Sequence, residues 1–173
     1  TQMGTGYTEV TLDRGEVSIP DSWQVAHMAQ EVGASTQTAI DYVLSGDEQW
    51  YEINAALNDL SSVSDDQIGV LHQQFDEIDG YRTPTKAAQI MAGLGFKTSQ
   101  HELPVEGFSG GWRMRLNLAK SLMSRADLML LDEPTNHLDL DAILWLETWI
   151  NAYTGLVIVI SHDQAFLDAT VGH

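Results

Sequence analysis

Two adjacent carboxylates, Asp132 and Glu133, directly follow the apolar run Leu128 to Leu131. Such a run predicts a strand buried in a parallel sheet, and ligands of open α/β sheets bind at the carboxyl ends of the strands. In phosphoryl-transfer sites an Asp at this place holds Mg²⁺, directly or through water, and a neighbouring carboxylate accepts a proton from the attacking water or orients it. Taken alone, such a pair is more often a solvated strand end than a catalytic site.

Two further groups have the chemistry to face an anion. Ser109, Gly110 and Gly111 precede a predicted helix, where backbone amides, the serine hydroxyl and the positive end of the helix dipole attract phosphate. An ordinary serine cap followed by two glycines is the alternative. His162 comes just after a second apolar run, Leu156 to Ile160, and its imidazole could contact a γ-phosphate there. Together, the order and spacing of these groups favour a nucleotide site.

A Gly-rich loop of the form G-x-x-x-x-G-K-[ST], whose amides and lysine cradle phosphates, occurs nowhere in the 173 residues. The segment Gly93 to Thr98 superficially resembles one. However, Phe96 separates the glycine from the lysine and no strand precedes the segment, so Gly95 is predicted to end a helix instead. We therefore expect the chain alone to bind ATP weakly or not at all, without turnover.

The elements that must position these groups alternate between helices and apolar strands from Ser109 onward. This alternation predicts an α/β fold with a parallel sheet buried on both faces. The expected elements are a helix to Ser124, a strand at Leu128–Leu131, a helix at Leu140–Tyr153, a strand at Leu156–Ile160 and a helix from Gln164. Upstream, we expect a β-hairpin at residues 7–19, a short strand at Trp23–Gln30 and helices at Ser35–Leu44 and Thr83–Leu94.

Between these upstream helices, apolar residues recur at spacings of three and four on two segments. Each set forms one narrow stripe and the link between them is short and polar, which predicts an antiparallel helical hairpin. A hairpin with one thin apolar seam is suited to protrude from a domain, although a pair lying flat on the core is the alternative. The two stripes are Trp50, Ile53, Leu57, Leu60 and Ile68, Leu71, Phe75, Ile78.

The composition is that of a globular protein, with 43% hydrophobic residues and a formal net charge of −17. Between Gly15 and Tyr81 there are thirteen acidic residues and no Lys or Arg, so this segment should repel phosphate backbones; a solvated acidic surface is the simpler explanation of the charge. No cysteine is present, which excludes disulfides and thiolate metal sites. The longest apolar stretch is far too short to span a bilayer, so we expect a soluble chain.

Three segments closely resemble an ATP-binding cassette of the ABC-F family. They are Phe-Ser-Gly-Gly-Trp-Arg-Met-Arg-Leu at 108–116, Leu-Leu-Asp-Glu-Pro-Thr-Asn-His-Leu-Asp at 130–139 and Ile-Ser-His-Asp at 160–163. The resemblance implies that Asp132 is the Walker B carboxylate that binds Mg²⁺, Glu133 the catalytic base and His162 the switch histidine. It implies a partial P-loop ATPase core with a parallel sheet and an inserted helical arm, and ATP and Mg²⁺ as cofactors.

By the same resemblance, Ser109, Gly110 and Gly111 form the signature loop, which contacts the γ-phosphate of ATP held by the opposite cassette. Asn136 to Asp139 form the D-loop, with Asp139 among the nucleotide-binding residues. Gln30 is the Q-loop glutamine, which contacts water and Mg²⁺. The implied parts are residues 1–30 up to the Q-loop, 31–107 with an arm at about 47–79, and 108–173 with the signature, Walker B, D-loop and switch histidine.

The resemblance also implies a role. We expect the C-terminal two-thirds or so of one cassette, the first of two, from a cytoplasmic ATPase that is linked to translation. Its partners would be ATP, a second cassette and, through the arm, the ribosome, and an uncovered sheet edge would favour self-association. The alternatives are the nucleotide-binding subunit of a membrane transporter, which would need a shorter helical insert, and a catalytically dead fragment that serves only for interaction.

Overall fold

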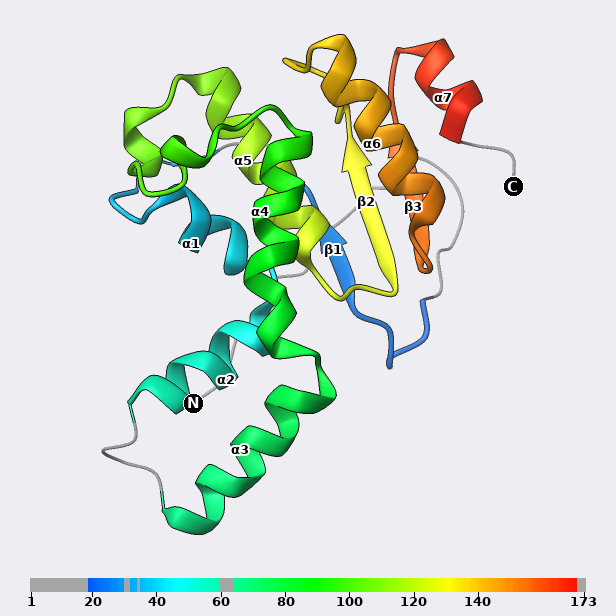
Figure 1. Ribbon diagram of the computed structural model, residues 1–173. Coiled ribbons are helices and arrows are strands. Elements are labelled where there is room, and N and C mark those ends of the chain that lie inside the picture. Colours follow the sequence, from blue (N-terminus) through cyan, green and yellow to red (C-terminus); the bar gives the residue numbers. More distant parts are fainter. Residues whose placement is uncertain (1–18, 30–31, 34, 60–63, 171–173) are drawn as a thin grey trace.

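The structure, a computed structural model, describes residues 19–29, 32–33, 35–59 and 64–170. Within these ranges three strands form one parallel sheet in the order β1-β2-β3 (Figure 1). The predicted α/β fold class is therefore confirmed. The predicted hairpin lies outside the described residues except for Ile19, and so does Gln30. The strands are β1 (Val25–His27), β2 (Leu128–Asp132) and β3 (Leu156–Ile160).

The predicted helices are present, with small shifts at their ends. The largest shift is at α1, which begins at Ala39 and not at Ser35. Thr38 caps this helix by accepting a hydrogen bond from the amide of Asp41, and the preceding Gln37 pairs its carbonyl with the amide of Val105 at 3.0 Å. The helices are α1 (Ala39–Leu44), α2 (Glu48–Asn58), α3 (Asp65–Glu77), α4 (Thr83–Gly93), α5 (Gly110–Met123), α6 (Leu140–Ala152) and α7 (Gln164–Thr170).

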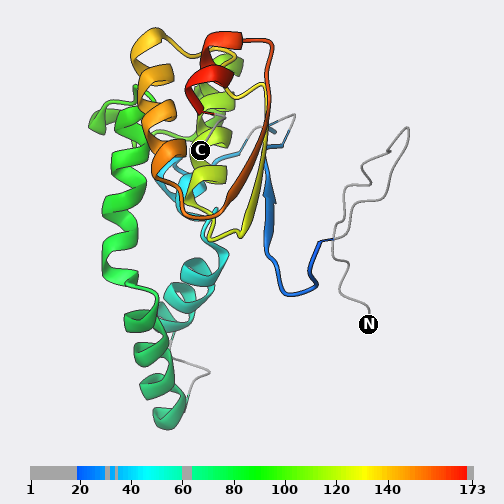
Figure 2. The same ribbon diagram turned by 90° about the vertical axis from the view of Figure 1, so that its right-hand side faces the viewer.

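The expectation of a sheet covered on both faces is not met in the described part of the chain. Alternate residues of β3 differ sharply: Val157 and Val159 pack against the core, whereas Leu156, Ile158 and Ile160 are 51%, 47% and 60% exposed. Both α5 and α6 lie on one side of the strands (Figure 2). The reason is topological, because right-handed crossovers that step twice in the same direction place both connecting helices on the same face.

Gly95 ends α4, as the sequence predicts, and is no part of a phosphate loop. Its φ is +91°, a backbone conformation that glycine adopts without steric cost. The amide of Phe96 then returns to the carbonyl of Met91 at 2.9 Å, which satisfies a carbonyl of the last helical turn.

Helices α2 and α3 form the predicted antiparallel pair and extend away from the sheet as an arm (Figure 1). Of the predicted stripe residues, Trp50, Ile53 and Phe75 are buried and Leu57, Leu71 and Ile78 pack against the core, whereas Leu60 lies outside the described residues. The indole of Trp50 donates a hydrogen bond to the carbonyl of Gly80 at 2.8 Å, which ties the start of α2 to the chain just beyond α3. The arm is thus anchored at its base by aromatic packing.

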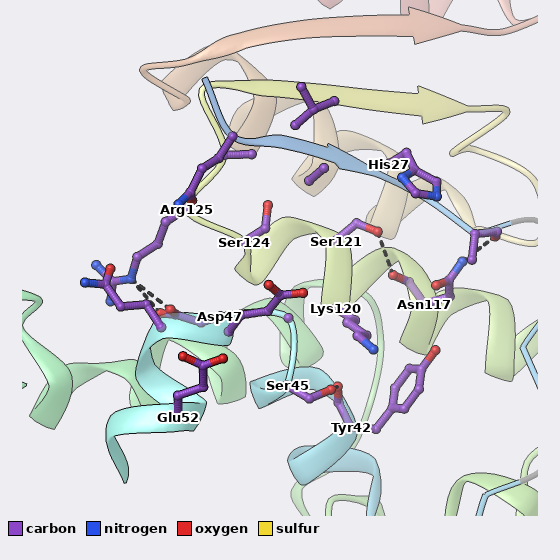
Figure 3. A pocket seen from close by; sticks show the side chains of 18 residues that line it. His27, Tyr42, Ser45, Asp47, Glu52, Asn117, Lys120, Ser121, Ser124 and Arg125 are labelled. Atoms are coloured by element: carbon purple, nitrogen blue, oxygen red, sulfur yellow. Dashed lines mark hydrogen bonds and ion pairs between the residues drawn. The ribbon is translucent and has the colours of Figure 1, made fainter. Parts of the chain in front are cut away.

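Arg125, which lies outside the arm, binds both ends of the arm where they join the rest of the fold. Arg125 follows α5, and its Nε donates to both oxygens of the Asp47 carboxylate, at 2.9 and 2.8 Å (Figure 3). Its Nη2 donates to the carbonyl of Ile78 at 2.9 Å. Asp47 is only 2% exposed and caps α2 through the amide of Trp50. A buried carboxylate of this kind requires a partner, so Arg125 joins the arm to the body.

Arg125→Ala should lower the free energy of unfolding by roughly 2 kcal/mol, because it leaves the Asp47 carboxylate buried without its cation; partial exposure of Arg125 keeps the loss below that of a fully buried pair. Urea denaturation followed by tryptophan fluorescence measures this, since Trp50 lies at the same base. The control is Arg82→Ala, whose pair with Asp79 is exposed on both sides and should change stability by less than about 0.5 kcal/mol. Equal losses would contradict the prediction.

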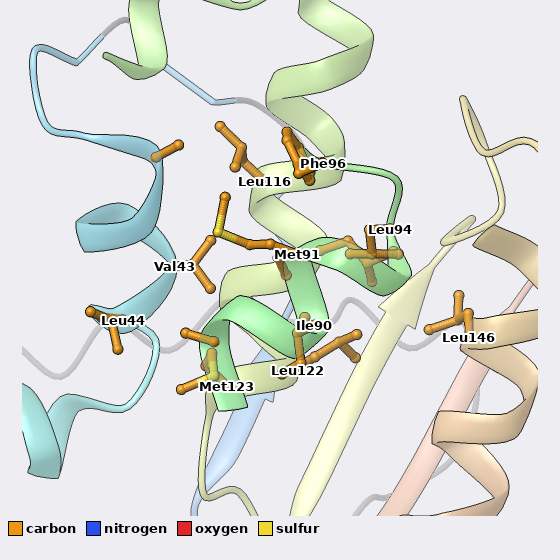
Figure 4. Packing of buried hydrophobic residues seen from close by; sticks show 14 of the residues in the cluster. Val43, Leu44, Ile90, Met91, Leu94, Phe96, Leu116, Leu122, Met123 and Leu146 are labelled. Atoms are coloured by element: carbon orange, nitrogen blue, oxygen red, sulfur yellow. The ribbon is translucent and has the colours of Figure 1, made fainter. Parts of the chain in front are cut away.

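The main core lies between α1, α4 and α5 on one side and the covered face of the sheet on the other. Val43, Met91, Leu116 and Leu122 point toward one another and have no exposed surface (Figure 4). Leu146 of α6 and Met129 of β2 extend this cluster. The packing fixes α5, and with it the Ser-Gly-Gly segment at its start, relative to the strands.

Candidate functional site

The carboxyl ends of β2 and β3 bring the predicted catalytic residues together. In the parallel register Asp132 lies opposite Ile160, and the amide of Glu133 donates to the Ile160 carbonyl at 2.7 Å. His162 follows two residues after Ile160 and therefore reaches Glu133. Residues 29 positions apart in the sequence meet because both follow adjacent parallel strands.

Glu133 and His162 are in direct contact. The His162 amide donates to Glu133 Oε2 at 3.3 Å, and His162 Nε2 lies 3.4 Å from Glu133 Oε1. Glu133 Oε1 is buried and accepts no hydrogen bond, whereas the imidazole is 99% exposed. The backbone of Glu133 has a φ of +48°, an uncommon conformation for a residue with a side chain. An uncommon backbone conformation together with a buried carboxylate oxygen that accepts no hydrogen bond is typical of a residue kept for chemistry.

A small cavity of about 80 Å³ adjoins Glu133, and Asp132, Met114, Asn136 and His137 are also among its lining residues. Asp132 is exposed at its edge. Within the described ranges no three His, Cys, Asp or Glu side chains gather closely enough to hold a metal ion by themselves. The Asp132 carboxylate beside the unsatisfied Oε1 of Glu133 still fits Mg²⁺. This ion binds through one or two carboxylates and completes its shell with water and substrate phosphates.

The Ser-Gly-Gly segment forms the N-terminus of α5. Ser109 is the N-cap residue, but its hydroxyl makes no capping hydrogen bond, so the alternative of an ordinary serine cap is not supported. Ser109 and Gly110 are exposed, and a Cβ on Gly110 would meet nothing within 4 Å. A Cβ on Gly111 would only touch His137 at an ordinary 3.5 Å. Packing within the described chain therefore does not explain the glycines.

Asp139 caps α6 by accepting a hydrogen bond from the amide of Ala142 at 3.0 Å. Its Oδ2 also accepts a hydrogen bond from Nη1 of Arg115 at 3.1 Å. The Ala142 amide first, and Arg115 second, hold the pKa of Asp139 below its usual value. The carboxylate is thus ionised at neutral pH and is engaged within the chain.

The remaining predicted residues are placed as follows. Among the described residues, no hydrogen bond or ion pair joins Ser109, Gly110 or Gly111 to the Glu133–His162 pair. Gln30 lies outside the described residues, although Ala29 just before it accepts a 2.6 Å hydrogen bond from the buried Asn117 of α5.

Sequence reasoning missed Arg125 and Arg115. Arg115 binds two segments outside its own helix, the end of α4 and the turn before α6. Arg115 stands three residues after Trp112 on α5, and this spacing places both side chains on one helix face. That spacing is the only sequence signal for it. The carbonyls that Arg115 reaches belong to residues more than twenty positions away, and no local pattern reports them.

A larger open cavity, of about 890 Å³, lies elsewhere, between β1, the start of α2 and the second half of α5 (Figure 3). His27, Tyr42, Lys120 and the Asp47–Arg125 pair line it. It contains none of the motif residues, so size alone does not locate the candidate site in this fold.

Comparison with known proteins agrees with this geometry. Residues 7–136 match the family described as "ABC transporter", and the chain belongs to that family of ATP-binding cassette proteins. Solved structures support the fold: an "RNase-L Inhibitor" superposes with a TM-score of 0.59 at 20% identity, over 91% of this chain and 25% of that one. An "ATP binding subunit of ABC transporter" gives 0.58 at 14% identity, over 85% and 52%.

The resemblance to the ABC-F branch is confirmed by the curated relatives. The chain is 49% identical over 164 residues to "Probable ATP-binding protein YheS" of Escherichia coli K12, covering 94% of this chain and 26% of the relative. It is 38% identical over 162 residues to human "ATP-binding cassette sub-family F member 3", covering 87% and 23%. The chain spans about a quarter of the length of these relatives. None of the helices described has both the length and the apolar character to cross a bilayer.

Proposed function

We propose that the chain is the part of an ABC-F ATPase that carries the catalytic base, Glu133, and the switch histidine, His162. This ATPase couples ATP binding and hydrolysis to a soluble task in the cytoplasm, namely ribosome-associated translation. The observation that carries the proposal is the contact of Glu133 with His162 at the carboxyl ends of β2 and β3. We call the longer, two-cassette protein that would contain this chain the parent protein. ATP supplies the γ-phosphoryl group when bound, and Mg²⁺ its charge neutralisation.

In this proposal Glu133 accepts a proton from the attacking water, and its Oε1, which accepts no hydrogen bond in the structure, is the atom available for it. The exposed imidazole of His162 serves the phosphate side, and the backbone amide of His162 orients Glu133 by donating to its Oε2. Asp132 holds Mg²⁺, with Gln30 as a second contact. Ser109, Gly110 and Gly111 serve the nucleotide of the second cassette, which agrees with the exposure of Ser109 and Gly110 and with the open space around Gly110.

The division into parts follows from these roles. Residues 1–30 lead to the Q-loop, 31–107 form a helical part with the arm at about 47–79, and 108–173 carry the signature, Walker B, D-loop and switch histidine. The arm would contact the ribosome, and Asp139 would act at the boundary between the two cassettes.

The second candidate is the nucleotide-binding subunit of a membrane transporter, and the third is an interaction fragment without catalysis. The protruding α2–α3 arm and the similarity to a sub-family F member favour the ABC-F proposal over a transporter subunit. The interaction fragment is distinguished by nucleotide binding.

The test compares two proteins by calorimetry with Mg-ATP: the 173-residue chain, and the same chain extended by the coding sequence upstream of Thr1. We expect no micromolar binding to the chain alone, because it contains no G-x-x-x-x-G-K-[ST] loop. The extended protein should bind ATP, whereas hydrolysis should also require the second cassette. Micromolar, Mg²⁺-dependent binding to the 173 residues would overturn the requirement for the loop. An upstream sequence without that loop would favour the interaction fragment.

A further inference from the structure

The side chain of Arg115 is placed where three segments meet. Its Nε donates to the carbonyl of His137 at 2.8 Å, and its Nη1 donates to the carbonyl of Leu94 at 3.1 Å and to Asp139 Oδ2 at 3.1 Å. The side chain is only 11% exposed. One guanidinium therefore joins α5 to the end of α4 and to both the turn and the cap that precede α6.

Trp112 forms the other side of this arrangement. The guanidinium carbon of Arg115 lies 4.5 Å from the centre of the Trp112 ring, a cation–π contact. Trp112 in turn packs edge-on against Phe96, with ring centres 4.9 Å apart, and Phe96 is buried. The guanidinium is thus held between an aromatic plane and the acceptors, which fixes its direction.

The acceptors belong to the segment that carries Glu133. This segment, residues 133–139, starts and nearly ends with residues in the left-handed region, Glu133 at φ +48° and His137 at φ +65°. Such a conformation persists only where its surroundings enforce it. Arg115 binds the carbonyl of His137 and the side chain of Asp139, so it supplies part of that enforcement from α5, the helix that begins at the Ser-Gly-Gly segment.

We propose that Arg115 is a positioning residue that, supported by Trp112, holds residues 133–139 in a fixed place relative to the start of α5. Glu133 and Ser109 then keep one geometry although they do not touch. The inference rests on the proposed function. It goes beyond it by assigning to Arg115 the coupling of two catalytic segments within one cassette.

The test uses the parent protein with Arg115→Met, which keeps an unbranched side chain but removes every donor. We expect kcat for ATP hydrolysis to fall about tenfold, because small displacements of a catalytic group are costly. KM should change less than about twofold, because the hydrogen bonds of Arg115 go to acceptors within the chain. Arg115→Lys should restore little of the lost kcat, because one ammonium group does not reproduce the several directed donors of the guanidinium. Lys120→Met is the matched control, because Lys120 lies on the same helix as Arg115 and also has a cation–π contact, with Tyr42 of α1.

Hydrogen exchange of the peptide that contains residues 134–139 is the second readout. It should become faster in Arg115→Met and, to a smaller extent, in Trp112→Leu, and remain unchanged in Lys120→Met. Unchanged exchange in Arg115→Met, or an unchanged kcat, would overturn the proposal. If Arg115→Met does not fold, Arg115→Lys and Trp112→Leu carry the same comparison. A parent protein without ATPase activity would refute the proposed function, while the exchange measurement would still decide the positioning role.

Discussion

Glu133→Gln in the parent protein should slow ATP hydrolysis by roughly 10²-fold or more while ATP binding is retained, the usual scale for loss of a general base. The amide has the shape of the carboxylate, and its oxygen can still accept the hydrogen bond from the His162 amide. What it loses is the basicity of Oε1, the atom that has no hydrogen-bond partner in the structure. Complexes closed on nucleotide should therefore accumulate.

Single-turnover assays check this, since they isolate the chemical step from nucleotide binding and release. The matched control is Glu106→Gln, the same substitution at an exposed residue of the short turn before α5, which should hydrolyse at the parental rate. Glu133→Gln turning over at the parental rate would show that another group takes the proton.

Shortening the arm should weaken ribosome co-sedimentation of the parent protein about tenfold and leave basal ATPase activity within about twofold. The structure defines how to shorten it. Asp47, Trp50 and Phe75 belong to the base, and removing them would strip Arg125 of its buried partner. Replacing residues 55–70 by a short Gly-Ser linker removes the outer part and spares those contacts. Unchanged co-sedimentation would place ribosome recognition outside the arm.

A charge-reversed arm distinguishes the kind of partner. Residues 47–79 contain no Lys or Arg, so a basic protein is a better partner for this surface than RNA phosphates. Asp66→Lys together with Asp76→Lys, both at exposed positions of α3, should therefore weaken ribosome binding. Tighter binding by this double variant would indicate contact with RNA.

The sequence by itself determined the order and type of the elements. The stripes of α2 and α3, the apolar runs of β2 and β3, and the glycine that ends α4 are signals between residues only a few positions apart, and each was confirmed. The motifs at Ser109, Asp132 and His162 were likewise sufficient for the family.

Only the tertiary structure decided which of these residues meet. Glu133 contacts His162 because adjacent parallel strands end together. In the described part of the chain, no helix covers one face of the sheet, because both crossovers turn the same way. Arg115 binds residues 21 to 24 positions away, and Arg125 binds Asp47, 78 positions away. Helix packing determines such partners. The helical repeat in a sequence indicates only the face on which a side chain lies, not which distant residues pack against that face.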